Sequence, residues 1–199
     1  MGGAQLIAIL RGFTAEQSVE LALRAWDVGF DLVEVPVQSE QAWQSLQDIL
    51  RVAEGRPVGA GTVLSVEQVH RAHSLGCGVI IAPNFSADIL EECRVRDLDY
   101  WPGVMTPTEI AAAAAAGATT LKVFPTGSLG PAYLRELRGP FPDLRLIAVG
   151  GVSLANAQEF VQAGADALAF GSSITEAVAP ENLSVISALV DTLRGRDRC

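Results

Sequence analysis

Basic residues, cysteines and long hydrophobic runs are scarce in this chain, and each scarcity excludes a class of protein. Of 199 residues, 49% are hydrophobic and 19% charged. That composition is typical of one globular domain of about 200 residues and excludes a disordered or fibrous chain. Lys and Arg number 14 against 23 Asp and Glu, so the net charge is −9, which argues against binding to nucleic acid or an anionic membrane. An anionic ligand therefore needs a local positive pocket.

The cysteines and the first residues carry no sign of secretion. Cys77, Cys93 and Cys199 are an odd number without metal-ligand or CxxC spacing, which is typical of a reduced cytosolic protein. The first residues lack a basic segment, their apolar run is too short for a signal peptide, and Leu6 stands where a myristoylation motif has Ser or Thr. No apolar stretch approaches the roughly 20 residues of a membrane span. We therefore expect a cytoplasmic protein without a membrane partner.

Lysine occurs once, at position 122, whereas arginine occurs 13 times. Lysine is among the commonest residues of soluble proteins, so this chain uses arginine wherever a surface cation is sufficient. Lys122 lies instead in the stretch Thr-Thr-Leu-Lys-Val-Phe-Pro, which is typical of a buried strand. A role in solubility does not explain a lysine there. Lys122 is therefore the first candidate for a functional residue.

Apolar runs rich in Val and Ile recur along the chain, bounded by Gly or Pro and separated by amphipathic stretches. This alternation predicts parallel β/α units, and glycines at positions 29, 76, 117 and 164 fit the left-handed ends of the helices. Eight such units close into a (β/α)8 TIM barrel, an α/β fold, so we expect one barrel domain over residues 1–199. The predicted strands are 6–10, 31–37, 57–63, 78–83, 100–104, 119–125, 145–151 and 165–171.

An open, doubly wound sheet is the alternative architecture. It often carries a three-glycine dinucleotide fingerprint, but segment 59–64, Gly-Ala-Gly-Thr-Val-Leu, lacks the third glycine. The sequence has no GxxxxGK[ST] phosphate loop either. The barrel is therefore the preferred prediction.

Two charged residues lie within predicted strands. Lys122 and Glu34 are each flanked by apolar neighbours, so the period of two along a strand points both side chains into the barrel. Buried charges are costly unless they are paired or used. One interpretation is a structural ion pair between them. The other is catalytic, because desolvation favours the neutral form of an amine, and that form attacks a carbonyl carbon.

Two glycine-containing loops follow the seventh and eighth predicted strands, where barrels often bind phosphate. Gly150-Gly151 and Gly171-Ser172 offer backbone N–H groups that suit an anion. The alternative is that these glycines only make tight turns.

Thr62 and two histidines are open to more than one interpretation. Thr62, at the end of the third predicted strand, is either a site residue or a helix N-cap. His70 and His73 have the i, i+3 spacing of a metal pair but lie toward the far end of a predicted helix. We expect them on a solvated helix face and predict no metal site.

Seven short motifs lie on the second to eighth predicted strands, one on each strand. They are Val-Glu34-Val-Pro, Gly-Ala-Gly-Thr62-Val, Ala-Pro83-Asn, Trp-Pro-Gly103, Leu-Lys122-Val-Phe124-Pro, Val-Gly150-Gly151-Val and Phe-Gly171-Ser172. Each alone is weak, but seven in order over nearly the whole chain resemble the 2-dehydro-3-deoxy-phosphogluconate/4-hydroxy-2-oxoglutarate aldolases. These are Schiff-base class I aldolases on a trimeric (β/α)8 barrel. The resemblance implies a homotrimer without a cofactor that acts on a phosphorylated 2-keto-3-deoxy sugar acid.

The resemblance also implies roles by position. Lys122 would be the Schiff-base lysine and Glu34 the general acid/base. The other residues that match the family's motifs would bind substrate. Thr62, Pro83 and Phe124 would line the substrate pocket, and Gly150, Gly151, Gly171 and Ser172 would contact the phosphate.

Two departures point to one branch of the family. Gln38 stands where gluconate-type enzymes have arginine, and Val149 where they have threonine; both would line the substrate site. With Ile-Ala-Ile-Leu-Arg11-Gly near the start, they resemble the galactonate branch, which cleaves 2-dehydro-3-deoxy-6-phosphogalactonate to pyruvate and glyceraldehyde 3-phosphate. Because Gln38 replaces the arginine, we expect Arg11 to bind the substrate carboxylate, to which a guanidinium is suited.

Other functions remain open at this point. One alternative is an aldolase for the gluconate epimer or for 4-hydroxy-2-oxoglutarate, and another is a phosphate-binding epimerase or isomerase. A further alternative is a non-catalytic barrel that binds a phosphorylated metabolite for regulation. Only an aldolase of this class forms a covalent adduct between Lys122 and pyruvate.

Overall fold

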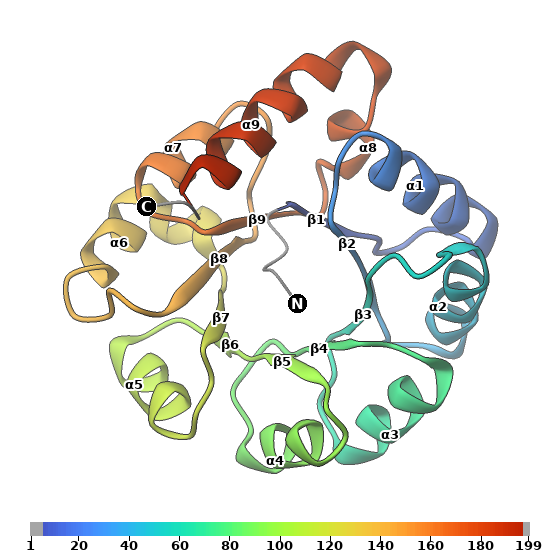
Figure 1. Ribbon diagram of the computed structural model, residues 1–199, viewed down its shortest axis with the longest axis horizontal. Coiled ribbons are helices and arrows are strands. Elements are labelled where there is room, and N and C mark those ends of the chain that lie inside the picture. Colours follow the sequence, from blue (N-terminus) through green and yellow to red (C-terminus); the bar gives the residue numbers. More distant parts are fainter. Residues whose placement is uncertain (1–5, 197–199) are drawn as a thin grey trace.

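Parallel strands alternate with helices around a closed barrel in the computed structural model, which describes residues 6–196 (Figure 1). The helices form an outer ring around the strands, so the predicted (β/α)8 architecture is confirmed. The strands in this range are β1 (Leu6–Ile9), β2 (Leu32–Pro36), β3 (Val58–Gly61), β4 (Val79–Ile81), β5 (Asp99–Trp101), β6 (Gly103–Val104), β7 (Thr120–Val123), β8 (Arg145–Val149) and β9 (Ala167–Phe170). The helices are α1 (Ala15–Asp27), α2 (Glu40–Val52), α3 (Val66–Leu75), α4 (Ala87–Val95), α5 (Pro107–Ala115), α6 (Thr126–Leu137), α7 (Ala157–Gln162), α8 (Ile174–Ala177) and α9 (Leu183–Arg196), with a short 3-10 helix at Pro180–Asn182.

The fifth predicted strand differs from expectation because it is broken in two. Pro102 separates β5 from β6, since proline has no N–H to give to a sheet ladder. The sheet order is β5-β4-β3-β2-β1-β9-β8-β7-β6, so its two ends are consecutive in the chain. Hydrogen bonds run from the Ala82 N–H to Trp101 O (3.2 Å) and from the Lys122 N–H to Pro102 O (2.9 Å). The barrel therefore closes through Pro102.

The helices end at the glycines where the sequence predicts their ends. The four glycines predicted at helix ends all have left-handed φ values, between +94° and +104°. Helix α3 begins after Ser65, whose Oγ accepts a hydrogen bond from the Gln68 N–H at 3.3 Å. Thr62 is therefore not the N-cap of this helix, which leaves the other of its two possible roles, that of a site residue.

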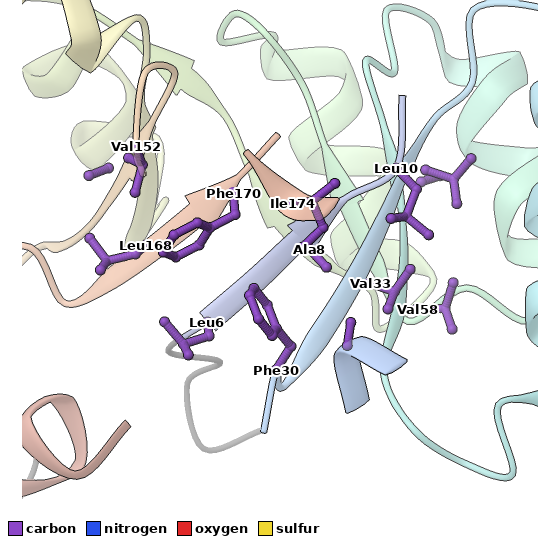
Figure 2. Close-up of a cluster of buried hydrophobic side chains, with 14 of the residues drawn as sticks. Leu6, Ala8, Leu10, Phe30, Val33, Val58, Val152, Leu168, Phe170 and Ile174 are labelled. Atoms are coloured by element: carbon purple, nitrogen blue, oxygen red, sulfur yellow. The ribbon is translucent and has the colours of Figure 1, made fainter. Parts of the chain in front are cut away.

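Apolar side chains pack on both sides of the strands. Figure 2 shows part of the outer core, between strands and helices, where the rings of Phe30 and Phe170 meet edge to face with centroids 5.6 Å apart. Side chains at the alternate strand positions fill the barrel interior, and each fully buried aliphatic group stabilises the fold by about 1.5–3 kcal/mol. These interior residues are Ile7, Ile9, Leu32, Val79, Ile81, Trp101, Ile147, Val149, Ala167 and Ala169.

The described cysteines lie in the core, and the two histidines lie on the surface of a helix. Cys77 and Cys93 are free thiols in the outer core, and burial raises the pKa of each to about 12, so both stay protonated at neutral pH. Cys199 lies outside the described residues.

His70 and His73 lie on an exposed face of α3, and His70 Nε2 is 2.8 Å from Glu92 Oε1 of α4. This is the solvated helix face that the sequence predicts.

Within residues 6–196, no helix has the length and apolar character needed to cross a membrane.

Candidate active site

A cavity of about 750 Å³ opens at the carboxyl ends of the strands. Every predicted site residue except Glu34 lines it, and Glu34 pairs with one that does. The barrel thus gathers residues from the ends of seven of the predicted strands around one space. The predicted residues in its lining are Arg11, Gln38, Thr62, Pro83, Lys122, Phe124, Val149, Gly150, Gly151, Gly171 and Ser172.

Lys122 of β7 and Glu34 of β2 form a buried ion pair at this cavity. Lys122 Nζ lies 3.6 Å from Glu34 Oε1, and the two side chains are 5% and 2% exposed. The neighbours Leu121 and Val123 pack in the outer core, as the period of two predicts. The ring centroid of Phe124 is 5.6 Å from Lys122 Nζ, within the range of a cation–π contact. The amine therefore sits between a carboxylate and an aromatic ring.

Hydrogen bonds do not satisfy all the polar atoms of this ion pair. A separation of 3.6 Å exceeds the length of an N–H···O hydrogen bond. Glu34 Oε1 is buried and has no hydrogen-bond partner among the described residues. A purely structural buried pair normally satisfies its polar atoms within the protein. Here one carboxylate oxygen is left to exchange a proton with a ligand or with a group bound to the amine.

The loop after β8 is held by hydrogen bonds to its carbonyl groups. The Thr126 hydroxyl lies 3.0 Å from both Val149 O and Gly150 O, and Asn156 Nδ2 donates to Gly151 O at 2.8 Å. Gly150 and Gly151 have φ values of +92° and +74°, the left-handed region that favours glycine. Their N–H groups donate to no acceptor within residues 6–196. Backbone N–H groups left free in a loop are suited to an anion.

The charges of the cavity favour an anionic ligand. Arg11 and Lys122 are the charged residues in its lining; because Glu34 pairs with Lys122, Arg11 supplies the uncompensated positive charge. Arg11 is exposed after β1 and makes no ion pair with any described residue. In a chain of net charge −9, this is the local positive pocket that an anion requires.

Thr62 lines the cavity in a strained backbone conformation. Its φ of +57° is left-handed, which costs a residue with a Cβ roughly 1–2 kcal/mol. Its side chain is nearly buried against the site. Strain of this kind concentrates at functional sites, because the surrounding structure has to hold it in place.

Three apolar residues of the lining were missed by the sequence analysis. They are Ile9, Phe13 and Leu64. Ile9 is the last residue of β1 and alternates with the inward-facing Ile7, so the period of two could have found it. Leu64 is 60% exposed and follows Thr62 by two residues, whereas no sequence pattern singles out Phe13.

Comparisons with known proteins identify the family. The family model for KDPG and KHG aldolase matches residues 1–189. The 2-dehydro-3-deoxy-6-phosphogalactonate aldolase of Escherichia coli (strain K12) is 37% identical over 174 residues, which cover 86% of this chain and 85% of that protein. The solved structure of native KDPGal has a TM-score of 0.84 at 32% identity and matches 100% of this chain and 98% of that chain. A cube-shaped protein cage designed by fusing symmetric oligomeric domains has a TM-score of 0.86 at 31% identity, with 98% of this chain and 75% of that chain covered. This chain therefore belongs to the KDPG and KHG aldolase family.

Proposed function

We propose that this protein is a class I aldolase that cleaves 2-dehydro-3-deoxy-6-phosphogalactonate to pyruvate and glyceraldehyde 3-phosphate. One observation carries the proposal: the single lysine of the chain is buried, faces a 750 Å³ cavity and lies 3.6 Å from Glu34 Oε1. The family membership supports the reaction type, and the E. coli relative, at 37% identity, supports the galacto-configured substrate.

Lys122 and Glu34 divide the chemistry between them. The neutral amine of Lys122 attacks C2 of the substrate, and Glu34 transfers the protons that convert the carbinolamine into an iminium ion with loss of water. Glu34 then accepts the proton of the C4 hydroxyl. The C3–C4 bond breaks, its electron pair enters the iminium to give an enamine, and the aldehyde leaves. Glu34 returns the proton to C3, and hydrolysis of the imine releases pyruvate.

The remaining site residues bind and orient the substrate. Arg11 pairs with the carboxylate, because a guanidinium matches its two oxygens. The pocket around the carbon chain is formed by Gln38, Thr62, Pro83, Phe124 and Val149. The free N–H groups of Gly150 and Gly151, with Gly171 and Ser172 after the neighbouring strand β9, hold the phosphate.

Borohydride reduction in the presence of pyruvate tests the proposal. The wild-type protein is expected to gain one reduced pyruvyl group, located at Lys122 by peptide mapping, since the chain has no other lysine side chain. The absence of an adduct would exclude a Schiff-base aldolase and favour an isomerase or a non-catalytic binding barrel. A retro-aldol assay on both C4 epimers then identifies the substrate.

Position 149 is expected to set the preference between epimers. Val149 is nearly buried at the end of β8 and offers no hydrogen bond, whereas threonine of similar size does. Val149→Thr should shift the ratio of kcat/KM values toward the gluco epimer by about 1 kcal/mol, or about fivefold. Val149→Ala changes the size without adding a hydroxyl and should leave the ratio near the wild-type value. A wild-type preference for the gluco epimer would contradict this assignment.

Thr126 is expected to hold in place the loop after β8, whose Gly150 and Gly151 N–H groups are proposed to bind the phosphate. Thr126→Val removes the hydroxyl that lies 3.0 Å from Val149 O and Gly150 O, so KM for the phosphorylated substrate should rise about fivefold, the equivalent of about 1 kcal/mol. Exchange of the pyruvate methyl protons, which needs no phosphate, should stay unchanged. Thr126→Ser keeps the hydroxyl and is the control. An equal loss in both reactions would indicate a collapsed loop instead.

We also propose a cytoplasmic homotrimer of single-domain chains that needs no metal or cofactor and binds no nucleic acid or membrane. The free thiols of Cys77 and Cys93 in the core support a reducing compartment. The likeness to a cage built from symmetric oligomeric domains supports an oligomer. The molar mass in solution, measured by light scattering, tests the trimer.

A further inference from the structure

We propose that Gly61 is a positioning residue for Glu34, because the space left by its missing side chain holds the Glu34 carboxylate. A Cβ atom placed on Gly61 would lie 2.2 Å from Glu34 Oε1 and 2.7 Å from both Cγ and Cδ. Real Cβ atoms essentially never approach other atoms this closely. Any side chain at position 61 therefore displaces the carboxylate. The consequence for catalysis rests on the proposed function of Glu34.

Space, and not backbone conformation, accounts for glycine at this position. The φ of Gly61 lies outside the left-handed region, so its backbone accepts an L-amino acid. Gly61 lies on β3 next to β2, and the pairing of Pro36 with Gly61 sets the two strands side by side. The three atoms nearest to such a Cβ all belong to the Glu34 side chain.

The carboxylate has little freedom to avoid such a contact. Glu34 is 2% exposed, so it does not turn out into solvent. Backbone hydrogen bonds fix β2 at Glu34 and β3 at Gly61. The Leu10 N–H donates to Glu34 O at 2.9 Å, and the Val37 N–H donates to Gly61 O at 2.8 Å. A Cβ at position 61 therefore changes the 3.6 Å separation between Glu34 and Lys122 rather than the path of the strands.

Gly61→Ala and Gly59→Ala form a matched pair of variants. Both glycines lie on β3 two residues apart, and so on the same strand face. The nearest atom to a Cβ at Gly59 is Val79 O at 3.3 Å, a contact that a small shift relieves. Gly61→Ala should lower turnover on the order of 10²-fold and change the pH profile of kcat, because the acid/base carboxylate is displaced, while pyruvate adduct formation persists. Gly59→Ala should remain close to wild type.

The Glu34→Ala background separates the proposed contact from a general defect of the strand. It removes the three Glu34 atoms that a Cβ at position 61 would strike. Gly61→Ala should lower the Tm of the wild-type protein but not that of Glu34→Ala. If Gly61→Ala alone fails to fold, the double variant should still fold with the Tm of Glu34→Ala.

Two results would overturn the inference: an equal fall in Tm in both backgrounds, or wild-type turnover and pH profile in Gly61→Ala. The Tm comparison does not depend on activity. A wild-type protein that forms no pyruvate adduct would therefore refute the proposed function and leave the contact between Gly61 and Glu34 to be judged on stability alone.

Discussion

Lys122→Arg should reduce retro-aldol turnover below about 10⁻⁴ of the wild-type rate, because the nucleophile itself is removed. The substitution keeps a positive charge beside Glu34, and the 750 Å³ cavity has room for the longer side chain. Guanidinium stays protonated in proteins and forms no imine with a ketone. The fold should therefore persist while the chemistry is lost. Circular dichroism and a retro-aldol assay measure the two effects separately.

A lysine placed elsewhere provides the control for this experiment. Arg24 is exposed on α1 and pairs with Glu20 at 2.7 Å. Adding Arg24→Lys to the Lys122→Arg variant restores one lysine to the chain, but at the surface. It should restore neither turnover nor the borohydride-trapped adduct with pyruvate. Substantial activity in Lys122→Arg, or an adduct at another residue, would refute the assignment of Lys122.

Glu34→Gln should lower kcat by about 10²- to 10⁴-fold, the usual contribution of a general acid/base. The amide has nearly the same shape as the carboxylate but does not accept a proton, so the steps at the C4 hydroxyl and at C3 lose their base and acid. Imine formation with pyruvate should become slower and remain measurable. Single-turnover trapping and steady-state cleavage distinguish these steps.

Glu40→Gln makes the same chemical change at the surface. Glu40 is 82% exposed and pairs with Arg71 at 2.7 Å. The proposed reaction gives Glu40 no role, so this variant should keep the wild-type kcat. If Glu34→Gln also kept it, Glu34 would be a structural partner of Lys122. The structural ion pair, one of the two interpretations that the sequence leaves open, would then be the correct one.

Much of the fold was predictable because its signals are local. The apolar runs, the glycines at helix ends and the period of two in the strands each depend on a few neighbouring residues. Local patterns do not report how a strand meets its partners. The break at Pro102 illustrates the difference, since the sequence indicates one strand there and the barrel uses its two halves to pair with β4 and β7.

The site shows the same division. Local alternation was sufficient to predict that Lys122 and Glu34 point inward, and the strand-end motifs were sufficient to select most of the residues that line the cavity, though not Ile9, Phe13 and Leu64. The catalytic and binding roles of those residues stay predictions. Thr62 was ambiguous in the sequence because an N-cap and a left-handed site residue carry similar local signals, and only the position of Ser65 at the start of α3 separates them.

The amino-acid pattern alone indicates which side chains face the interior and at which end of the strands they gather. Their distances come from the folded barrel: the 3.6 Å between Lys122 Nζ and Glu34 Oε1, and the space at Gly61 that the carboxylate occupies. The direction of a side chain follows from the geometry of its own strand. The separation between two strands far apart in the sequence depends on the closure and register of the whole barrel, which arise from packing across the chain.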